Sequence, residues 1–312
     1  MANSDRLKIR HLHTLVAVAE QGTLVRAADV LSVSQPAVSK TLAELEDIVA
    51  QRLFERTPKG LKLTSAGRVL LRYAGSSLRA IREGLECIAN ESTVDAPAVL
   101  VGALPNVAAT ILPIALLRFA AESPHARVTV RTGSNAQLIA ALHQGVLDLV
   151  IGRLAEPTAM QGLSFEHLYS ELLVLAVRPA HALARRRRIG AGTISPYRMV
   201  LPDAGTRIRE AADRFFMASG IGLPQAVIET IDVSFGRRYV LQSDAIWCVP
   251  LGAVENDLAE GTLVRLPVDT RMTEGPVGLT QRVDRLPSTA VSRLVEEIRQ
   301  CAMERLGRGP QG

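Results

Sequence analysis

The sequence predicts a multidomain α+β chain with a small helical unit that carries a β-hairpin, a long helix, and a larger two-lobed α/β unit. Three observations support this prediction. Apolar side chains recur at helical spacing through the first part of the chain, a near-heptad stripe covers residues 65–90, and strand-like and helix-like segments alternate after residue 97. With 312 residues, 47% of them hydrophobic and 21% charged, the chain is long enough for two or three globular units.

Composition excludes several classes of protein. The longest apolar runs, LLVLAV and AVLVGAL, are far shorter than the roughly 20 residues that span a bilayer, so no membrane segment is predicted. The charged N-terminus MANSDRLKIRHLH lacks the apolar core of a secretory signal peptide, and we expect the chain in the cytoplasm. Its three cysteines are far apart and form no CxxC pair. We therefore expect no disulfide, no metal site and no cofactor.

Positive charge is concentrated at the N-terminal end. Residues 1–90 contain 13 Lys and Arg against 9 Asp and Glu, a net charge of +4, whereas residues 91–312 contain 23 against 22. All four lysines lie in the first segment. This distribution favours an anionic partner for the first unit, and a merely solvated basic face is the alternative.

Three short helices are predicted in the first unit. The first extends from Arg10 to Gln21, and the second follows Thr23, a residue type that caps helix N-termini. Ser34 is the predicted cap of the third helix, which tolerates Pro36 in its first turn. In this third helix, the apolar stripe that we expect to face the core of the unit consists of Val38, Leu42, Leu45 and Val49.

The outer face of the third helix is polar. Gln35, Ser39, Lys40 and Thr41 carry hydrogen-bonding groups suited to base edges and phosphates. Two helices joined by a tight turn, the second apolar inward and polar outward, form a helix-turn-helix that places its second helix in the major groove of double-stranded DNA. An ordinary three-helix bundle is the alternative.

A basic hairpin follows these helices. Within RLFERTPKGLKLTSAG, Pro58 and Gly60 separate two short alternating stretches, with Lys59 at the tip and Arg56 and Lys62 beside it. Such a hairpin next to a recognition helix is a wing, which contacts the minor groove or the phosphates and adds salt-dependent affinity.

The next segment predicts a long helix that pairs with a second copy. A helix of some 25 residues attached to so small a unit has little of its own chain on which to bury an apolar seam, so a homodimer is favoured. Packing of this stripe on the following domain is the alternative. The near-heptad positions are Leu70, Ala74, Ser77, Ile81, Leu85 and Ile88.

The polar segment ESTVDAP separates this helix from an α/β unit. Strand-like runs alternate with helices, which predicts parallel α/β lobes joined by crossovers near residues 166 and 267 and a cleft between them. Three strand-to-helix turns, at 104–106, 132–135 and 201–206, would offer free amides and positive helix dipoles to a ligand. A small carboxylate suits such turns.

The run from Ala27 to Leu71 resembles the winged helix-turn-helix of LysR-type transcriptional regulators. It contains the AAxxLxxSQPAVS core, the LxxLE that closes the recognition helix, the LFER entry to the wing and the LTxxG exit at the spacing of that family. The resemblance implies a DNA-binding regulator that is not an enzyme. The residues that it places near DNA are Ser34, Gln35, Pro36, Ser39, Lys40, Arg56 and Lys59.

The resemblance extends over the whole chain and implies its domain organisation. Residues 1–64 correspond to the DNA-binding domain, 65–90 to the dimerising linker helix, and 91–312 to an effector-binding domain similar to two-lobed solute-binding proteins. Its first lobe covers about 97–165 and 267–305, and its second about 166–266. Many relatives hold effector carboxylates with a hydroxyl just after the first strand, where this chain has Ala103. The expected effector-binding residues are Ala103, Leu104, Pro105, Asn106, Gly133, Ser134, Asn135, Pro202, Asp203 and Thr206.

Within the family, the stretches VGALPNVAATILP, LIAALHQGVLDLVIGRL and GLSFEHLYSELLVLAVRP look most like regulators of protocatechuate catabolism. That likeness implies an activator of aromatic-acid genes of the β-ketoadipate route. SFEHLYSE is also shared with a regulator of sugar-binding-protein genes, so a sugar-uptake regulator stays open. The expected partners are double-stranded DNA, a small carboxylate effector, further copies of the chain as dimer or tetramer, and RNA polymerase.

Two further sequence features bear on function. The run Arg185–Arg188 resembles a nucleic-acid patch by composition and is interpreted as a solvated loop. HExxH, GxSxG and GxxxxGK motifs are absent from the sequence, and no nucleophile is paired with a base. An α/β solute-binding module or enzyme with a helical dimerisation segment is the alternative from another class.

Overall fold

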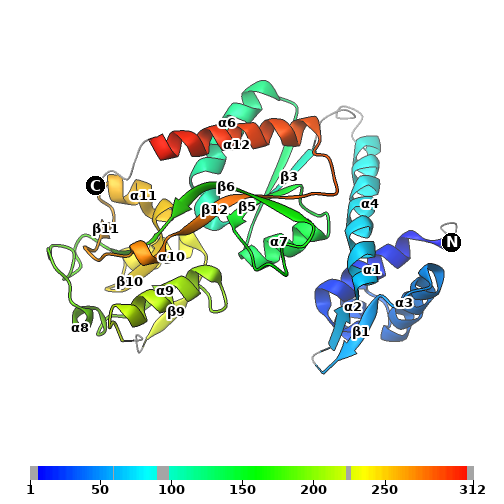
Figure 1. The fold of residues 1–312 in the computed structure, drawn as a ribbon, viewed down its shortest axis with the longest axis horizontal. Coiled ribbons are helices and arrows are strands. Elements are labelled where there is room, and N and C mark those ends of the chain that lie inside the picture. Colours follow the sequence, from blue (N-terminus) through cyan, green and yellow to red (C-terminus); the bar gives the residue numbers. More distant parts are fainter. Residues whose placement is uncertain (1–5, 59, 90–97, 223–225, 308–312) are drawn as a thin grey trace. The chain divides into compact units, whose positions relative to one another are not determined.

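The computed structural model describes residues 6–58, 60–89, 98–222 and 226–307 (Figure 1). It divides into two compact units, one built around the N-terminal helices and hairpin and one around the two sheets of the α/β part. None of the described helices is long and apolar enough to cross a membrane.

The N-terminal unit begins with the three predicted helices, α1 (Ile9–Gln21), α2 (Leu24–Leu31) and α3 (Gln35–Val49). The hydroxyls of Thr23 and Ser34 cap α2 and α3 by accepting backbone N–H bonds from Arg26 and Ala37. Val38, Leu42 and Leu45 lie in the core as predicted, and Val49 packs against it half-buried. Ile48 is buried as well. The three helices share one apolar core with the wing.

The wing consists of β1 (Phe54–Thr57) and β2 (Gly60–Leu63), which pair antiparallel. The backbone N–H of Leu61 donates to the carbonyl of Gly22 at 2.8 Å and so joins β2 to the α1–α2 turn. The 25-residue helix α4 (Ser65–Ala89) follows, and Leu71 and Ala74 of its first half belong to the shared core.

The first sheet of the α/β unit has the strand order β4-β3-β5-β12-β6. Its strands are β3 (Ala98–Ala103), β4 (Arg127–Thr132), β5 (Leu149–Arg153), β6 (Leu163–Glu171) and β12 (Gly275–Arg282). The expected parallel pairing holds for β3, β4 and β5, but β12 lies antiparallel between β5 and β6. The sheet is therefore mixed, because its fourth strand enters from a distant part of the sequence.

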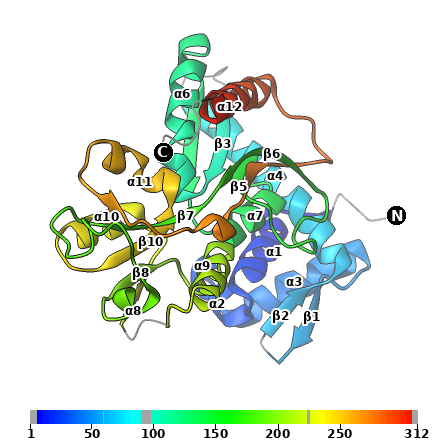
Figure 2. The same ribbon diagram turned by 60° about the vertical axis from the view of Figure 1, so that its left-hand side comes forward.

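The helices of this first lobe are α5 (Pro105–Ala108), α6 (Ile111–Glu122), α7 (Asn135–His143) and α12 (Thr289–Gly307). Both views show α6 and α12 side by side (Figures 1 and 2). The segment that follows β3 forms two helices, α5 and α6, and not one continuous helix. The helical conformation is interrupted at Thr110, whose backbone dihedral angles are not helical. The hydroxyl of Thr110 donates to the carbonyl of Asn106 at 2.9 Å.

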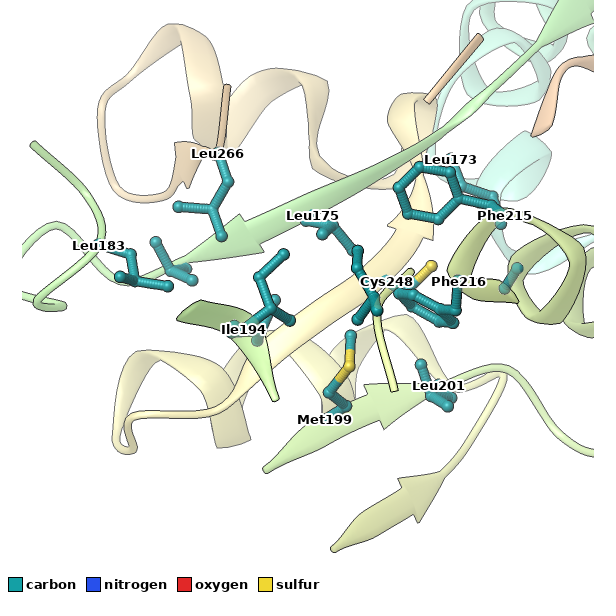
Figure 3. Packing of buried hydrophobic residues seen from close by; sticks show 14 residues of the cluster. Leu173, Leu175, Leu183, Ile194, Met199, Leu201, Phe215, Phe216, Cys248 and Leu266 are labelled. Carbon is teal, nitrogen blue, oxygen red and sulfur yellow. The ribbon is translucent and has the colours of Figure 1, made fainter. Parts of the chain in front are cut away.

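The second sheet has the order β11-β7-β10-β8-β9. Its strands are β7 (Leu173–Val177), β8 (Met199–Leu201), β9 (Val227–Glu229), β10 (Ile246–Pro250) and β11 (Val264–Arg265). Its helices are α8 (Ala191–Ile194), α9 (Arg207–Ala218), α10 (Val233–Leu241) and α11 (Leu251–Ala259), followed by the 3₁₀ turn η2 (Arg271–Thr273). Figure 3 shows Phe215 and Phe216 of α9 packed near Leu173 and Cys248.

The chain passes between the two lobes twice. Strand β6 ends at Glu171 and β7 begins at Leu173, and the return leads from β11 to β12. The boundary expected near residue 166 lies inside β6, because pairing with β12 holds that strand in the first sheet. The single residue Leu172 connects the last strand residue of the first lobe, in β6, to the first strand residue of the second lobe, in β7.

Candidate DNA-binding surface and ligand cavity

The recognition helix presents the expected residues to solvent. Gln35, Pro36, Ser39 and Lys40 are all exposed on the N-terminal half of α3, while Val38 on the opposite face is 1% exposed. Ser34 is also exposed, and its hydroxyl accepts the N–H of Ala37 at 3.4 Å as the helix cap. One short helix thus presents a continuous polar surface on a buried apolar base.

The wing is fastened to this helix by a carboxylate that the sequence analysis did not identify. Oε1 of Glu46 accepts the N–H of Leu53 at 2.7 Å and that of Phe54 at 3.3 Å, and Oε2 accepts from Arg52 at 2.8 Å. Glu46 belongs to the LxxLE pattern, which could have signalled this role. Arg56 and Lys62 are exposed on the wing, and Lys59 lies outside the described residues.

The apolar stripe on α4 divides into two parts. Ala74 is buried in the core of the N-terminal unit, and Leu70 packs against that core. Ile81 and Leu85 are 40% and 62% exposed. Ser77 is exposed as well, and the side chain of Ile88 lies outside the described residues. An apolar surface therefore remains open on the second half of the helix.

A cavity lies between the lobes of the α/β unit. The space between its lining atoms, including open solvent at its mouth, is about 640 Å³. The described lining contains two arginines and no Asp or Glu. Its members are Leu104, Pro105, Asn106, Gly133, Ser134, Asn135, Arg153, Pro202, Thr206, Arg207, Ile208, Thr230, Ile231, Val233, Trp247, Cys248, Val249 and Pro250.

Each of the three predicted turns contributes residues to this cavity, and eight of the ten expected effector-binding residues line it. Ala103 is fully buried in β3, where its side chain contributes to the core. Asp203 is half-buried outside the lining, and its carbonyl accepts the hydroxyl of Thr206 at 2.7 Å. Trp247 and Cys248, which lie in an apolar strand and are buried, also line the cavity. Burial raises the pKa of the Cys248 thiol to about 12.

The polar side chains of the turns already have partners within the protein. Asn135 donates to the carbonyl of Arg153 at 2.9 Å and accepts its N–H at 3.0 Å, which fixes the end of β5. The hydroxyl of Ser134 donates to Gln137 at 3.0 Å, and that of Thr206 caps α9. These groups build the cavity wall, and other donors are left to meet a charged ligand.

Asn106 belongs to a buried network at the joint between the lobes. Its amide donates to Oε2 of Glu171 at 2.5 Å, and Oε1 of Glu171 accepts the N–H of Gly252 at the start of α11 at 2.9 Å. Burial raises the pKa of Glu171 above its usual value, although Arg153 opposes this shift. One side chain thus links the first lobe, the cavity wall and the second lobe.

Arg153 is the cation that the sequence analysis missed. It is the last residue of β5 and only 8% exposed, and burial lowers the pKa of its guanidinium. Nη2 donates to the carbonyl of Glu171 at 3.1 Å, while Nε is buried without a partner among the described atoms. Arg153 therefore contributes a positive charge to the cavity wall, close to the buried carboxyl group of Glu171.

The second arginine of the cavity already has a partner. Arg207, the first residue of α9 in the second lobe, donates to Glu156 of the first lobe. Both side chains are about half exposed. Arg207 therefore joins the two lobes at the surface, whereas Arg153 is buried.

The comparisons with known proteins agree with this architecture. Residues 9–68 match the "bacterial regulatory helix-turn-helix protein, lysR family", and residues 95–302 match the "LysR substrate binding domain". The chain is 43% identical over 300 residues to the transcriptional regulator PcaQ of Agrobacterium fabrum, covering 96% of each chain. It is 39% identical over 297 residues to the regulator YdcI of Escherichia coli, covering 95% of this chain and 96% of that one.

A solved structure shows the same fold. Full-length OxyR from Pseudomonas aeruginosa superposes with a TM-score of 0.60 at 21% identity, over 95% of both chains. A lysR-type helix-turn-helix joined to a LysR substrate-binding domain defines a bacterial transcription regulator. The chain belongs to the LysR family. The members of this family are DNA-binding regulators and not enzymes; they bind small-molecule effectors and form oligomers.

Proposed function

We propose that this protein activates genes of aromatic-acid catabolism in response to a small carboxylate bound in the cavity. The observation that carries the proposal is Arg153, a buried cation with an unpartnered Nε at a cavity whose described lining has no acidic side chain. Guanidinium groups bind carboxylates through paired, charge-assisted hydrogen bonds. The cavity therefore favours a small anion over a neutral sugar.

The pathway rests on likeness to relatives. The stretches of the α/β unit that resemble regulators of protocatechuate catabolism, and the 43% identity to PcaQ, support an acid of the β-ketoadipate route. The apolar walls formed by Trp247, Ile208 and Val233 suit a ring or a short carbon chain beside a carboxylate. A regulator of sugar uptake is the second candidate, because SFEHLYSE occurs in both groups.

We assign residues 1–64 to the DNA-binding domain, 65–90 to the dimerisation helix and 91–312 to the effector domain. Ser34, Gln35, Pro36, Ser39 and Lys40 would contact the major groove, with Arg56 and Lys59 on the wing. Exposed Ile81 and Leu85 would pair with a second copy, and dimers would assemble into tetramers. Effector binding would change the closure of the lobes and so the spacing of the DNA-binding domains. Recruitment of RNA polymerase in the bacterial cytoplasm completes the proposed mechanism.

Thermal unfolding of the full-length protein tests the ligand. Protocatechuate, its ring-opened products and several sugars are each added at increasing concentration. A ligand at 100 times its dissociation constant stabilises the domain that binds it by about 2.7 kcal/mol. Stabilisation by one of the acids alone supports the proposal, and stabilisation by sugars alone selects the second candidate.

Two variants test the role of Arg153. Arg153→Met should abolish the acid-dependent stabilisation, because it removes the positive charge and its donors, while Arg153→Lys should keep part of it. Arg214→Met is the matched control, because Arg214 is exposed on α9 outside the cavity lining. A full response from Arg153→Met would show that the carboxylate binds elsewhere.

A further inference from the structure

The loop between β7 and α8 carries an uncompensated run of positive charge. The sequence between Glu171 and Asp203 contains six arginines and no acidic residue. Arg178 is paired with Asp244 at 2.8 Å. The consecutive residues Arg185–Arg188 are all exposed, and their guanidinium groups have no hydrogen-bond or ion-pair partner in the described part of the chain. The loop is the green segment that leads into α8 in Figure 1.

This loop is ordered rather than merely solvated. His181 is 3% exposed, and its Nδ1 accepts the N–H of Leu183 at 3.1 Å while Nε2 lies 3.2 Å from the carbonyl of Asp244. Leu183 belongs to the core of the second lobe, and Ile189 packs against that core. The four arginines are thus held between two anchored ends, and less loop entropy is lost when they bind a partner.

The chemistry of the loop fits a phosphate backbone better than a protein. Specific protein interfaces contain a buried apolar or aromatic centre. No large hydrophobic side chain is exposed anywhere in the described chain from residue 155 to residue 216. Guanidinium groups bind phosphate oxygens in pairs, and closely spaced phosphates are available along duplex DNA.

Operator binding by the N-terminal unit tethers the rest of the chain to DNA. Once the helix-turn-helix is bound to an operator, every other contact between the same chain and that DNA is intramolecular, at a high effective concentration. A patch too weak to bind DNA by itself can therefore still contribute. This step rests on the operator binding of the LysR family.

We propose that Arg185–Arg188 form a second, sequence-independent DNA contact that binds the phosphates of DNA flanking the operator. The contact adds salt-dependent affinity and leaves base preference to the recognition helix. It would favour DNA that bends toward the second lobe, because such DNA gains additional ionic contacts.

The salt dependence of DNA binding tests the proposal. The full-length protein and a variant with all four arginines changed to Gln are titrated with a labelled mixed-sequence duplex at a series of KCl concentrations. Each lost phosphate contact reduces the slope of log K against log salt by about 0.9, so the slope should become shallower by about 3 to 4. A variant with four lysines instead should keep most of the slope, and Lys40→Ala in the same assay reports the recognition helix separately.

A matched control removes the same charge elsewhere. Arg214, Arg238, Arg285 and Arg293 are also exposed in the α/β unit, and their joint change to Gln should alter the slope by less than about one. Equal changes in the two variants would attribute the effect to net charge and overturn the proposal. An unchanged slope in the loop variant would overturn it too, and if promoter activation were then lost, the partner of the loop would be a protein.

Discussion

The side-chain amide of Asn106 donates to Glu171 at 2.5 Å, and the same carboxyl group accepts the backbone N–H of Gly252 at 2.9 Å. Asn106 lines the cavity, and Gly252 begins a helix of the second lobe. Glu171 therefore connects the cavity wall to the second lobe through one hydrogen bond on each side.

Asn106→Ala should destabilise the α/β unit by about 1 to 3 kcal/mol, because Oε2 of the buried Glu171 loses its donor. Chemical unfolding monitored through the single tryptophan, Trp247, measures the change. Asn256→Ala on the exposed face of α11 is the control and should stay within about 0.5 kcal/mol. Equal stability of the two variants would contradict the structural role of the amide.

Gly67→Ala should destabilise the N-terminal unit and weaken DNA binding. A Cβ at Gly67 would lie 2.1 Å from the carbonyl oxygen of Leu53, a backbone atom that cannot give way without moving the wing. Gly84→Ala in the same helix has nothing within 4 Å and should stabilise the helix by about 0.5 to 1 kcal/mol. Thermal unfolding of both variants checks the prediction, which fails if they shift in the same direction.

The second lobe should lose stability as the pH falls below the usual histidine pKa of 6.5. Burial lowers the pKa of His181, and Arg178 also favours the neutral ring, whereas the carbonyl and carboxylate of Asp244 oppose this shift. Because the unfolded chain binds the proton more readily, the contribution of His181 is present above pH 6.5 and declines below it.

Unfolding midpoints measured from pH 7.5 down to about 5 test this dependence. His181→Asn should be less stable at neutral pH and should show a smaller loss on acidification. His125→Asn, at an exposed position of the first lobe, serves as the control. If His181→Asn kept the pH profile of the wild type, His181 would not be the cause of the loss of stability at low pH.

Arg56→Ala should lower the salt slope of DNA binding by about one without changing the preferred sequence. Gln35→Ala should instead change which base pairs are preferred, because Gln35 lies on the exposed face of the recognition helix. Binding selections with randomised duplexes separate the two effects. A uniform loss on all sequences from Gln35→Ala would mean that the residue only positions the helix.

The chain should dimerise through the exposed half of α4. Ile81→Glu together with Leu85→Glu should shift the protein toward a smaller species in light scattering, since two charges in an apolar seam repel the paired copy. Leu286→Glu, at a position that is 92% exposed in the other unit, is the control and should leave the mass unchanged. If the mass of the α4 variant were unchanged, the dimer interface would lie on another part of the chain.

Local patterns allowed the sequence to predict the N-terminal unit almost residue by residue. The caps Thr23 and Ser34, the i, i+3, i+4 spacing of apolar residues and the Pro-Gly turn of the hairpin are all short-range signals. The polar residues of the strand-to-helix turns were found in the same way, because turn chemistry is local. Their hydrogen bonds to Gln137 and Arg153 were not, since side-chain partners depend on the packed structure.

Long-range features were missed. Strand β12 reads as GPVGLTQR, whose proline and two glycines disfavour a strand, and its place between β5 and β6 depends on partners more than 100 residues away. Arg153 ends an apolar run, where only the tertiary structure reveals burial and an unpartnered Nε. Helix α11 follows β10 directly at Pro250, and no polar cap marks its beginning.

The position of β12 fixes an order of events during synthesis. Because β12 lies between β5 and β6, the first sheet cannot close until Gly275–Arg282 has left the ribosome, after the entire second lobe. Until then β5 exposes an unpaired edge and β6 has no neighbour, a state prone to aggregation. A chain that stalls or is cut between β11 and β12 would thus contain a complete second lobe and an incomplete first sheet. The first lobe, which begins to be translated first, is therefore the last to finish folding.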